Sequence, residues 1–138
     1  MRTLCKVVIL GIAMAMTGCE VEGPVFQRHP PTSQYAVIYV YRPYHYFGSA
    51  IEPDVTCGHS TAAIGAGGYH AFVEEPGIIN CYSYTEVGRG ISFEARPEAE
   101  YFVREEVDWG FVEGRIHFYL VNRGVGLDEI QECRQGQQ

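Results

Sequence analysis

Lysine is almost absent from this chain of 138 residues: Lys6 is the only one, whereas Asp and Glu together number 17. Beyond Arg2 and Lys6, eight arginines face those 17 acids, a net charge of 8 − 17 = −9. The arginines are scattered, so the sequence offers no basic patch for a nucleic acid. We therefore expect no nucleic-acid partner, and we expect the acidic chain to be repelled by anionic lipid headgroups.

Motifs for catalysis and metal binding are also lacking. The sequence contains no Cys-x-x-Cys, His-x-x-x-His or Gly-x-Ser-x-Gly, and no glycine loop leads into a helix. The acid pairs Glu74-Glu75 and Glu105-Glu106 point to opposite faces if they lie on strands, so we interpret them as solvated charges. We expect no metal, no cofactor and no enzymatic activity.

A long apolar segment is missing as well. The uncharged run from Val7 to Cys19 has 13 residues, whereas a membrane-spanning helix needs about 20. Arg2 and Lys6 precede it, and this charge pattern is typical of an export signal. We predict a signal peptide over residues 1–18.

The junction Met16-Thr17-Gly18-Cys19 resembles the lipobox of bacterial lipoproteins. The resemblance implies that Cys19 becomes a lipidated N-terminus and that its acyl chains anchor the protein stably to a membrane. Glu20 follows where an inner-membrane retention signal would have Asp, which favours the outer membrane, facing the periplasm. The alternative is an ordinary signal peptide with Cys19 as an incidental thiol.

Proline marks the next segment. Pro24, Pro30 and Pro31 lie within residues 19–33, and such a composition favours an extended chain. We predict that this segment is a linker that lifts the domain off the membrane, with His29 in solvent.

Three cysteines remain in the exported part: Cys57, Cys81 and Cys133. An oxidising compartment favours a disulfide over a metal site that also uses His59 and His70. We predict the pair Cys57–Cys81, with Cys133 as the alternative partner.

Residues 34–138 are predicted to be one domain. Short β-branched and aromatic segments alternate with turn signals every 8–12 residues or so, which is typical of an all-β antiparallel sandwich of transthyretin- or immunoglobulin-like type with about seven or eight strands. The segment Tyr35–Arg42 is apolar on both faces and should be a central strand that ends at Pro43. The other candidates are Ile51–Thr56, His59–Ile64, Tyr69–Val73, Ile78–Tyr84, Ile91–Ala95, Tyr101–Val107 and Arg115–Asn122.

The last segment changes period. Leu127, Ile130 and Cys133 have helical spacing, so we predict a short helix over Leu127–Arg134 that caps an edge or end of the sandwich. In Arg115–Asn122, we expect Ile116, Phe118 and Leu120 to face the core.

Together, the lipobox, the proline-rich segment, the strand Ala36–Pro43 and the glycine turns at Gly58, Gly67 and Pro76-Gly77 resemble an uncharacterised family of small bacterial lipoproteins. The pattern is also similar to transthyretin-like and PEGA-type sandwiches. These resemblances imply a fold and a location but no catalytic residues.

Aromatic loops offer the best candidate for a binding surface: Tyr44, Tyr46 and Phe47 follow Arg42, and Trp109 lies in a later turn. We expect a non-catalytic, lipid-anchored envelope protein that contacts another envelope protein or peptidoglycan. The alternatives are a carbohydrate- or peptidoglycan-binding module, an envelope hydrolase that uses His59 or His70, or rings that fold back over a sheet end.

Overall fold

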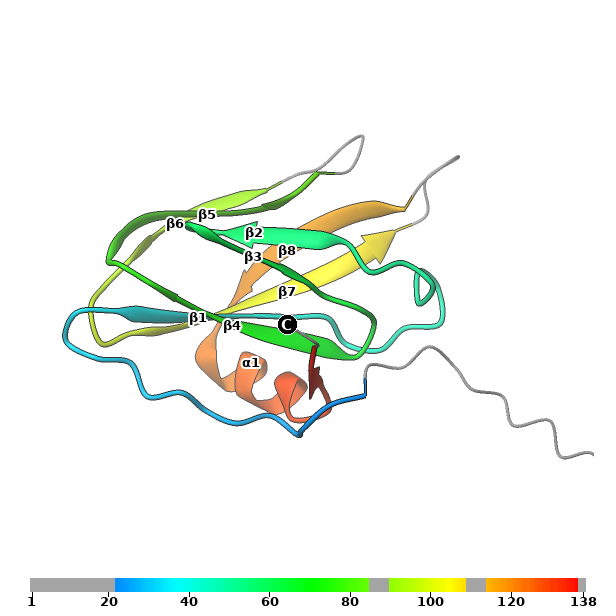
Figure 1. The fold of residues 1–138 in the computed structure, drawn as a ribbon, viewed down its shortest axis with the longest axis horizontal. Coiled ribbons are helices and arrows are strands. Elements are labelled where there is room, and N and C mark those ends of the chain that lie inside the picture. Colours follow the sequence, from blue (N-terminus) through cyan, green and yellow to red (C-terminus); the bar gives the residue numbers. More distant parts are fainter. Residues whose placement is uncertain (1–21, 85–89, 109–113, 137–138) are drawn as a thin grey trace, which may run out of the picture.

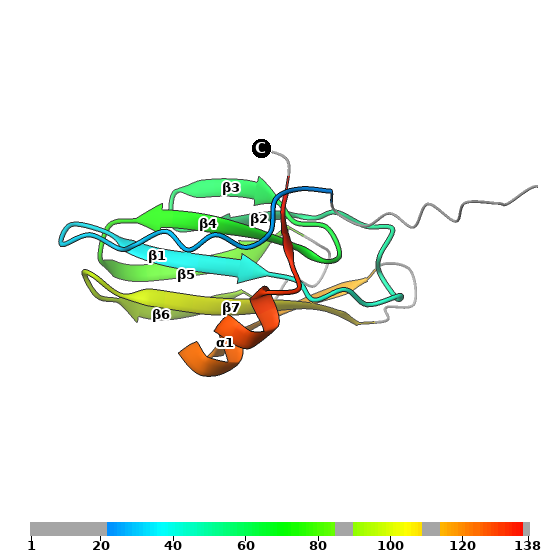
Figure 2. The ribbon, with the colours of Figure 1, turned by 90° about the horizontal axis from the view of Figure 1, so that it is seen from below.

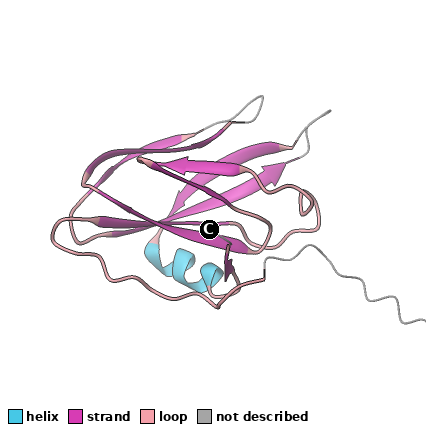
Figure 3. Ribbon diagram, in the orientation of Figure 1, coloured by secondary structure: helices cyan, strands magenta, loops and turns pink. Residues whose placement is uncertain are grey.

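The computed structural model describes residues 22–84, 90–108 and 114–136. Strands form two sheets, and one short helix lies outside them (Figures 1 and 3). A five-stranded sheet has the order β8-β7-β1-β4-β9, and a four-stranded sheet has the order β3-β2-β5-β6. The elements are β1 (Ala36–Tyr41), β2 (Asp54–Cys57), β3 (Ser60–Ala63), β4 (Gly68–Glu74), β5 (Gly77–Ser83), β6 (Ile91–Ala95), β7 (Glu100–Asp108), β8 (Arg115–Val121), α1 (Arg123–Ile130) and β9 (Arg134–Gln135).

The main core lies between the two sheets. Ile38, Val40 and Val103 of the larger sheet pack in one buried cluster with Val55 and Ile79 of the smaller one. Alternation along each strand puts every second side chain in this layer. The predicted mostly-β architecture with two facing sheets is therefore confirmed.

Strand β1 is the centre of the larger sheet, as its apolar pattern predicted. Every residue from Ala36 to Tyr41 is at most 1% exposed. The pairing differs from the prediction, because β1 is antiparallel to β4 but parallel to β7. The short strand β9 is also parallel to its neighbour β4. The larger sheet is thus mixed, and only the smaller sheet is purely antiparallel.

Each of the eight predicted strands overlaps one of β1 to β8, and β6 has the predicted bounds Ile91–Ala95. In β8, Ile116 and Phe118 face the core, but Leu120 is 48% exposed. The prediction for Leu120 was wrong: Leu120 lies near the end of β8, beyond the part of the strand whose side chains join the core. Cys57 and Cys81 are directly opposite each other on β2 and β5 and form the predicted disulfide.

The helix begins and ends earlier than predicted. It spans Arg123–Ile130, and the side chain of Asn122 caps it by accepting a hydrogen bond from the Val125 backbone N–H at 3.0 Å. Instead of capping an edge, α1 packs on the outer face of the larger sheet, where Ile130 joins Tyr39, Tyr41 and Phe102 in a second buried cluster. Figure 2 shows α1 lying across this face.

The predicted linker spans residues 19–33, and its described part, residues 22–33, is packed on the domain and does not extend away from it. The segment runs along the outer face of the larger sheet, on the same side as α1 (Figures 1 and 2). Phe26 packs edge-to-face on Tyr39 and Tyr69, with ring centroids 5.2 and 5.3 Å apart. We call residues 23–32 the N-terminal strap. The prolines made the strap extended, but burial of Phe26 holds it against the domain.

Candidate binding site

Arg42 organises the loop that carries the predicted aromatic surface. It follows the last residue of β1 and is only 3% exposed. Its guanidinium donates hydrogen bonds to the backbone oxygens of Ile51, at 2.9 Å, and of Gly48. Burial lowers the pKa of Arg42, while the nearby acids Glu105 and Glu52 oppose that shift. The buried cation therefore ties both ends of the β1–β2 connection to the sheet.

The three described aromatic residues of the predicted surface lie together in this loop. Tyr44 is 52% exposed, Tyr46 is 78% exposed and Phe47 is 47% exposed. The Phe47 ring lies 5.7 Å from the rings of both His45 and Tyr46, measured between centroids. The fourth predicted residue, Trp109, lies outside the described residues, as does Cys19.

A pocket of about 340 Å³ lies between this loop and the end of β7. It forms where β1 leaves the sheet: the pairing of β1 with β7 ends at Arg104, whereas β7 stays paired with β8 as far as Asp108. Pro43 has no N–H with which to extend the ladder. The pocket is lined by Arg42, Pro43, Tyr44, His45, Phe47, Arg104, Glu105, Glu106, Val107 and Asp108.

Glu105 is the most unusual residue of this pocket. It is 1% exposed, and neither oxygen of its carboxyl group has a hydrogen-bond partner among the described residues. Burial raises the pKa of Glu105 to about 8, although the Arg42 charge acts in the opposite direction. The carboxyl group is therefore mostly protonated at neutral pH and can donate a hydrogen bond.

The acid pairs were predicted to be solvated, and this is wrong for one member of each pair. Glu74 is 4% exposed and Glu105 is 1% exposed, whereas Glu75 is exposed and Glu106 is partly so. Adjacent residues do point to opposite faces, as expected for strands. One of Glu74's oxygens accepts hydrogen bonds from the His59 backbone N–H, at 3.1 Å, and contacts the His59 ring Nδ1 at 3.2 Å.

Arg104 and Glu106 line the pocket from the outer face of the larger sheet, where they belong to a group of charged side chains. Arg104 pairs with Glu129 of α1 at 2.9 Å and with Glu106 at 2.8 Å. Tyr41 donates a hydrogen bond to the same Glu129 carboxylate, and burial together with that bond raises the pKa of Tyr41. The Arg104 guanidinium also lies 5.7 Å from the centre of the Tyr119 ring. These contacts fix α1 to β7 beside the pocket.

The remaining predicted residues do not join this pocket. Cys133 is buried with a free thiol, and burial raises its pKa to about 12. His70 is half-buried, which lowers its pKa, and its ring packs against Phe72 at 4.7 Å. In residues 22–84, 90–108 and 114–136, no three His, Cys, Asp or Glu side chains are placed to hold a metal ion.

Sequence reasoning noted Arg42 beside the rings but missed its buried role, and it interpreted Glu105 as a solvated charge although the side chain is buried. A signal for Glu105 was present, since alternation along β7 places it on the same face as Val103 and Val107.

Comparisons with known proteins leave the family open. The chain matches no protein-family model, and no curated protein is significantly similar to it. Within the described part of the chain, no helix has the length and apolar character required to cross a bilayer.

Proposed function

We propose that this protein is a lipid-anchored, non-catalytic binding module of the bacterial cell envelope. Acyl chains on Cys19 hold it in the outer membrane, on the periplasmic side. The export signal over residues 1–18 and the small residues before Cys19 support this location. The partner is another envelope component, either a protein or peptidoglycan.

The finer fold assignment is part of this proposal. The domain is a sandwich of the uncharacterised lipoprotein family, similar to transthyretin-like and PEGA-type sandwiches. The buried strand β1 with its Pro43 stop supports the assignment. So do the turn glycines Gly58 and Gly77, whose φ angles of 66° and 140° favour glycine.

One observation carries the binding function: the pocket combines exposed rings with the charged side chains of Arg104, Glu106 and Asp108. Tyr44, His45 and Phe47 line the pocket together with Glu105. Aromatic walls supply apolar contact area, and a few polar groups set the orientation of a ligand. Arg104 and His45 can donate to a carbonyl or hydroxyl oxygen of that ligand, whereas both Glu105 oxygens are buried behind the pocket surface.

Peptide and sugar ligands both offer such oxygens. The exposure of Tyr44 and Tyr46 favours a carbohydrate- or peptidoglycan-binding module as the second candidate, because aromatic rings stack on sugar faces. An increase in the melting temperature of the protein with soluble muropeptides, and none with protein partners alone, would favour the carbohydrate- or peptidoglycan-binding module.

In-cell crosslinking tests the proposal directly. A photo-crosslinking residue at Tyr44 should capture a partner in cells that carry the intact lipid anchor, and Phe47→Ala should reduce that capture. The matched control is the same residue at Glu75, an exposed position in the β4–β5 turn at the far end of the sheet. Equal capture from both positions would argue against the pocket as the contact site.

Fractionation tests the anchor separately. The Cys19→Ala variant should move from the membrane fraction to the soluble fraction. If it remains in the membrane fraction, the lipid anchor is wrong.

A further inference from the structure

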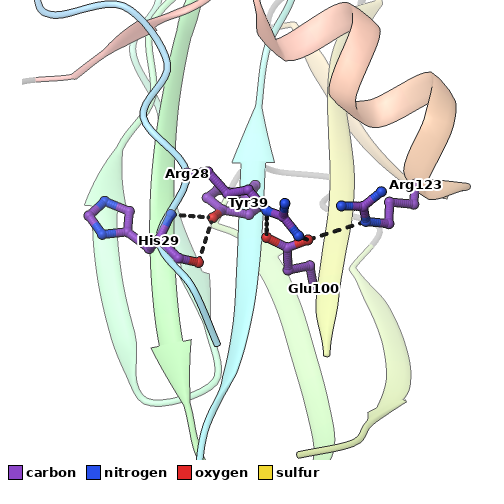
Figure 4. Close-up of polar contacts among 5 residues, drawn as sticks. All are labelled: Arg28, His29, Tyr39, Glu100 and Arg123. Carbon is purple, nitrogen blue, oxygen red and sulfur yellow. Dashed lines mark hydrogen bonds and ion pairs between the residues drawn. The ribbon is translucent and has the colours of Figure 1, made fainter. Parts of the chain in front are cut away.

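Hydrogen bonds hold the N-terminal strap on the domain, so the strap does not act as a flexible linker. The Gln27 backbone N–H donates to the Tyr69 hydroxyl at 3.2 Å. The Tyr39 hydroxyl accepts from the His29 backbone N–H at 2.8 Å and donates to the His29 carbonyl oxygen at 3.0 Å. Figure 4 shows the two bonds between Tyr39 and His29 beside the ion pairs of Glu100.

Glu100, the first residue of β7, holds the strap through an ion pair with Arg28. Arg28 donates to its carboxylate at 2.7 Å, and Arg123 of α1 lies 3.3 Å from the same group (Figure 4). Burial of Glu100 opposes ionisation, but the two arginines lower its pKa overall. The strap, β7 and α1 therefore meet at one ionised carboxylate.

The start of the strap lies at the same end of the sheet as the aromatic loop. Backbone hydrogen bonds link Gln135 N–H to Pro24 O at 3.0 Å, Arg134 N–H to Gly67 O at 2.8 Å and Gly67 N–H to Arg42 O at 2.8 Å. Arg42 is the residue at which the loop begins. Figures 1 and 2 both show the blue start of the strap at the end that carries the β1–β2 connection.

The chain between the strap and the lipidation position is short. From Cys19 to Gly23 there are 23 − 19 = 4 peptide units, which reach at most about 14 Å. Gly23 itself lies tightly against β9, since a Cβ there would come within 2.0 Å of the Gln135 carbonyl oxygen. An anchored Cys19 would therefore keep this end of the domain close to the lipid.

The surface at this end suits a bilayer interface. Tyr46 is 78% exposed and does not line the pocket, and Ile51 nearby in the chain is 37% exposed. Tyrosine rings favour the boundary between lipid and water. The acids Glu52 and Asp108 oppose anionic headgroups, so the contact depends on apolar area and not on charge.

We propose that the short tether and the docked strap turn the Tyr44–Phe47 end of the sandwich toward the membrane, with Tyr46 in contact with the lipid interface. This inference rests on the proposed lipidation of Cys19. It places the mouth of the Glu105 pocket at the bilayer surface, so its ligand is bound beside the membrane and not deep in the periplasm.

Fluorescence quenching in vesicles tests this orientation. The lipidated protein is reconstituted in phosphatidylcholine vesicles that contain lipid with a spin label near the headgroup. A fluorophore is attached at Tyr46→Cys or, as the control, at Glu75→Cys. Both positions are exposed, whereas Cys57 and Cys81 are bridged and Cys133 is buried. Strand β4, of seven residues, separates the two ends by about 23 Å.

We expect severalfold stronger quenching at position 46 than at position 75. An insert of about ten Gly and Ser residues after Glu20 should remove that difference, because it makes the tether flexible. Equal quenching at both positions in protein that floats with the vesicles would overturn the orientation but leave the anchor intact. Failure to float with vesicles would overturn the anchor and the orientation together.

Discussion

The burial of Glu105 can be tested through the pH dependence of the free energy of unfolding. Its pKa is about 8 in the folded protein, against an ordinary value of 4.5. Between these two values the unfolded chain has lost the proton and the folded protein has kept it. The free energy of unfolding must therefore fall as pH rises through this window, by about 1.4 kcal/mol per pH unit. Glu105's contribution is fully present below pH 4.5 or so and is lost by about pH 8.

The variant Glu105→Gln isolates this effect because its amide does not titrate. Relative to wild type, the variant should gain about 3 kcal/mol of stability between pH 5 and pH 7.5. Urea unfolding followed by circular dichroism, at several pH values in that range, measures this difference. Other titrating groups, such as His70 and Glu100, are present in both proteins, so their contributions cancel.

The control is Glu106→Gln, which removes the neighbouring carboxyl group on the opposite face of β7. If the stability difference between wild type and Glu105→Gln is flat from pH 5 to 7.5, Glu105 ionises normally in the folded protein. A slope of equal size for Glu106→Gln would show that the effect does not depend on burial. Either result would refute the argument that the pocket contains a neutral carboxyl group.

Two further predictions concern the packing. Gly126→Ala should destabilise the protein by about 1–3 kcal/mol, because the new Cβ would come within 2.3 Å of the Phe102 side chain; Gly124→Ala, with 3.5 Å to its nearest neighbour, is the control. Thermal unfolding that ranks the two variants in the opposite order would contradict the docking of α1. Replacing both Cys57 and Cys81 by Ala should cost about 3.5 kcal/mol through loop entropy over the separation of 24 residues. Chemical unfolding of non-reduced wild type and the double variant checks that value, and equal stabilities would contradict it.

Local pattern was enough to place the strands but not to pair them. The segment Ile91–Ala95 has a clean alternation, and β6 occupies that range. The parallel contact between β1 and β7 joins residues more than 60 positions apart, such as Val37 and Glu100. Alternation specifies which face of a strand is buried and leaves the neighbouring strand open.

The helix was misplaced for a similar reason. The helical spacing of Leu127, Ile130 and Cys133 predicted a start at Leu127, but α1 begins at Arg123 and includes Gly124 and Gly126, although glycine weakens helices. In the folded protein Gly126 is required by close packing on Phe102, a contact that no local pattern reveals. The cap at Asn122 was a readable signal, because Asn is a favoured N-cap residue.

The strap explains a feature of β1 that the sequence shows but does not account for. Val37, Tyr39 and Tyr41 face away from the main core and yet are at most 1% exposed. A sheet covered on one side only would leave these rings in water. The strap and α1 supply the missing layer, and the Tyr39 hydroxyl binds the backbone of the strap itself. The two-sided apolar pattern of β1 therefore implies a third layer, and the proline-rich segment is part of it.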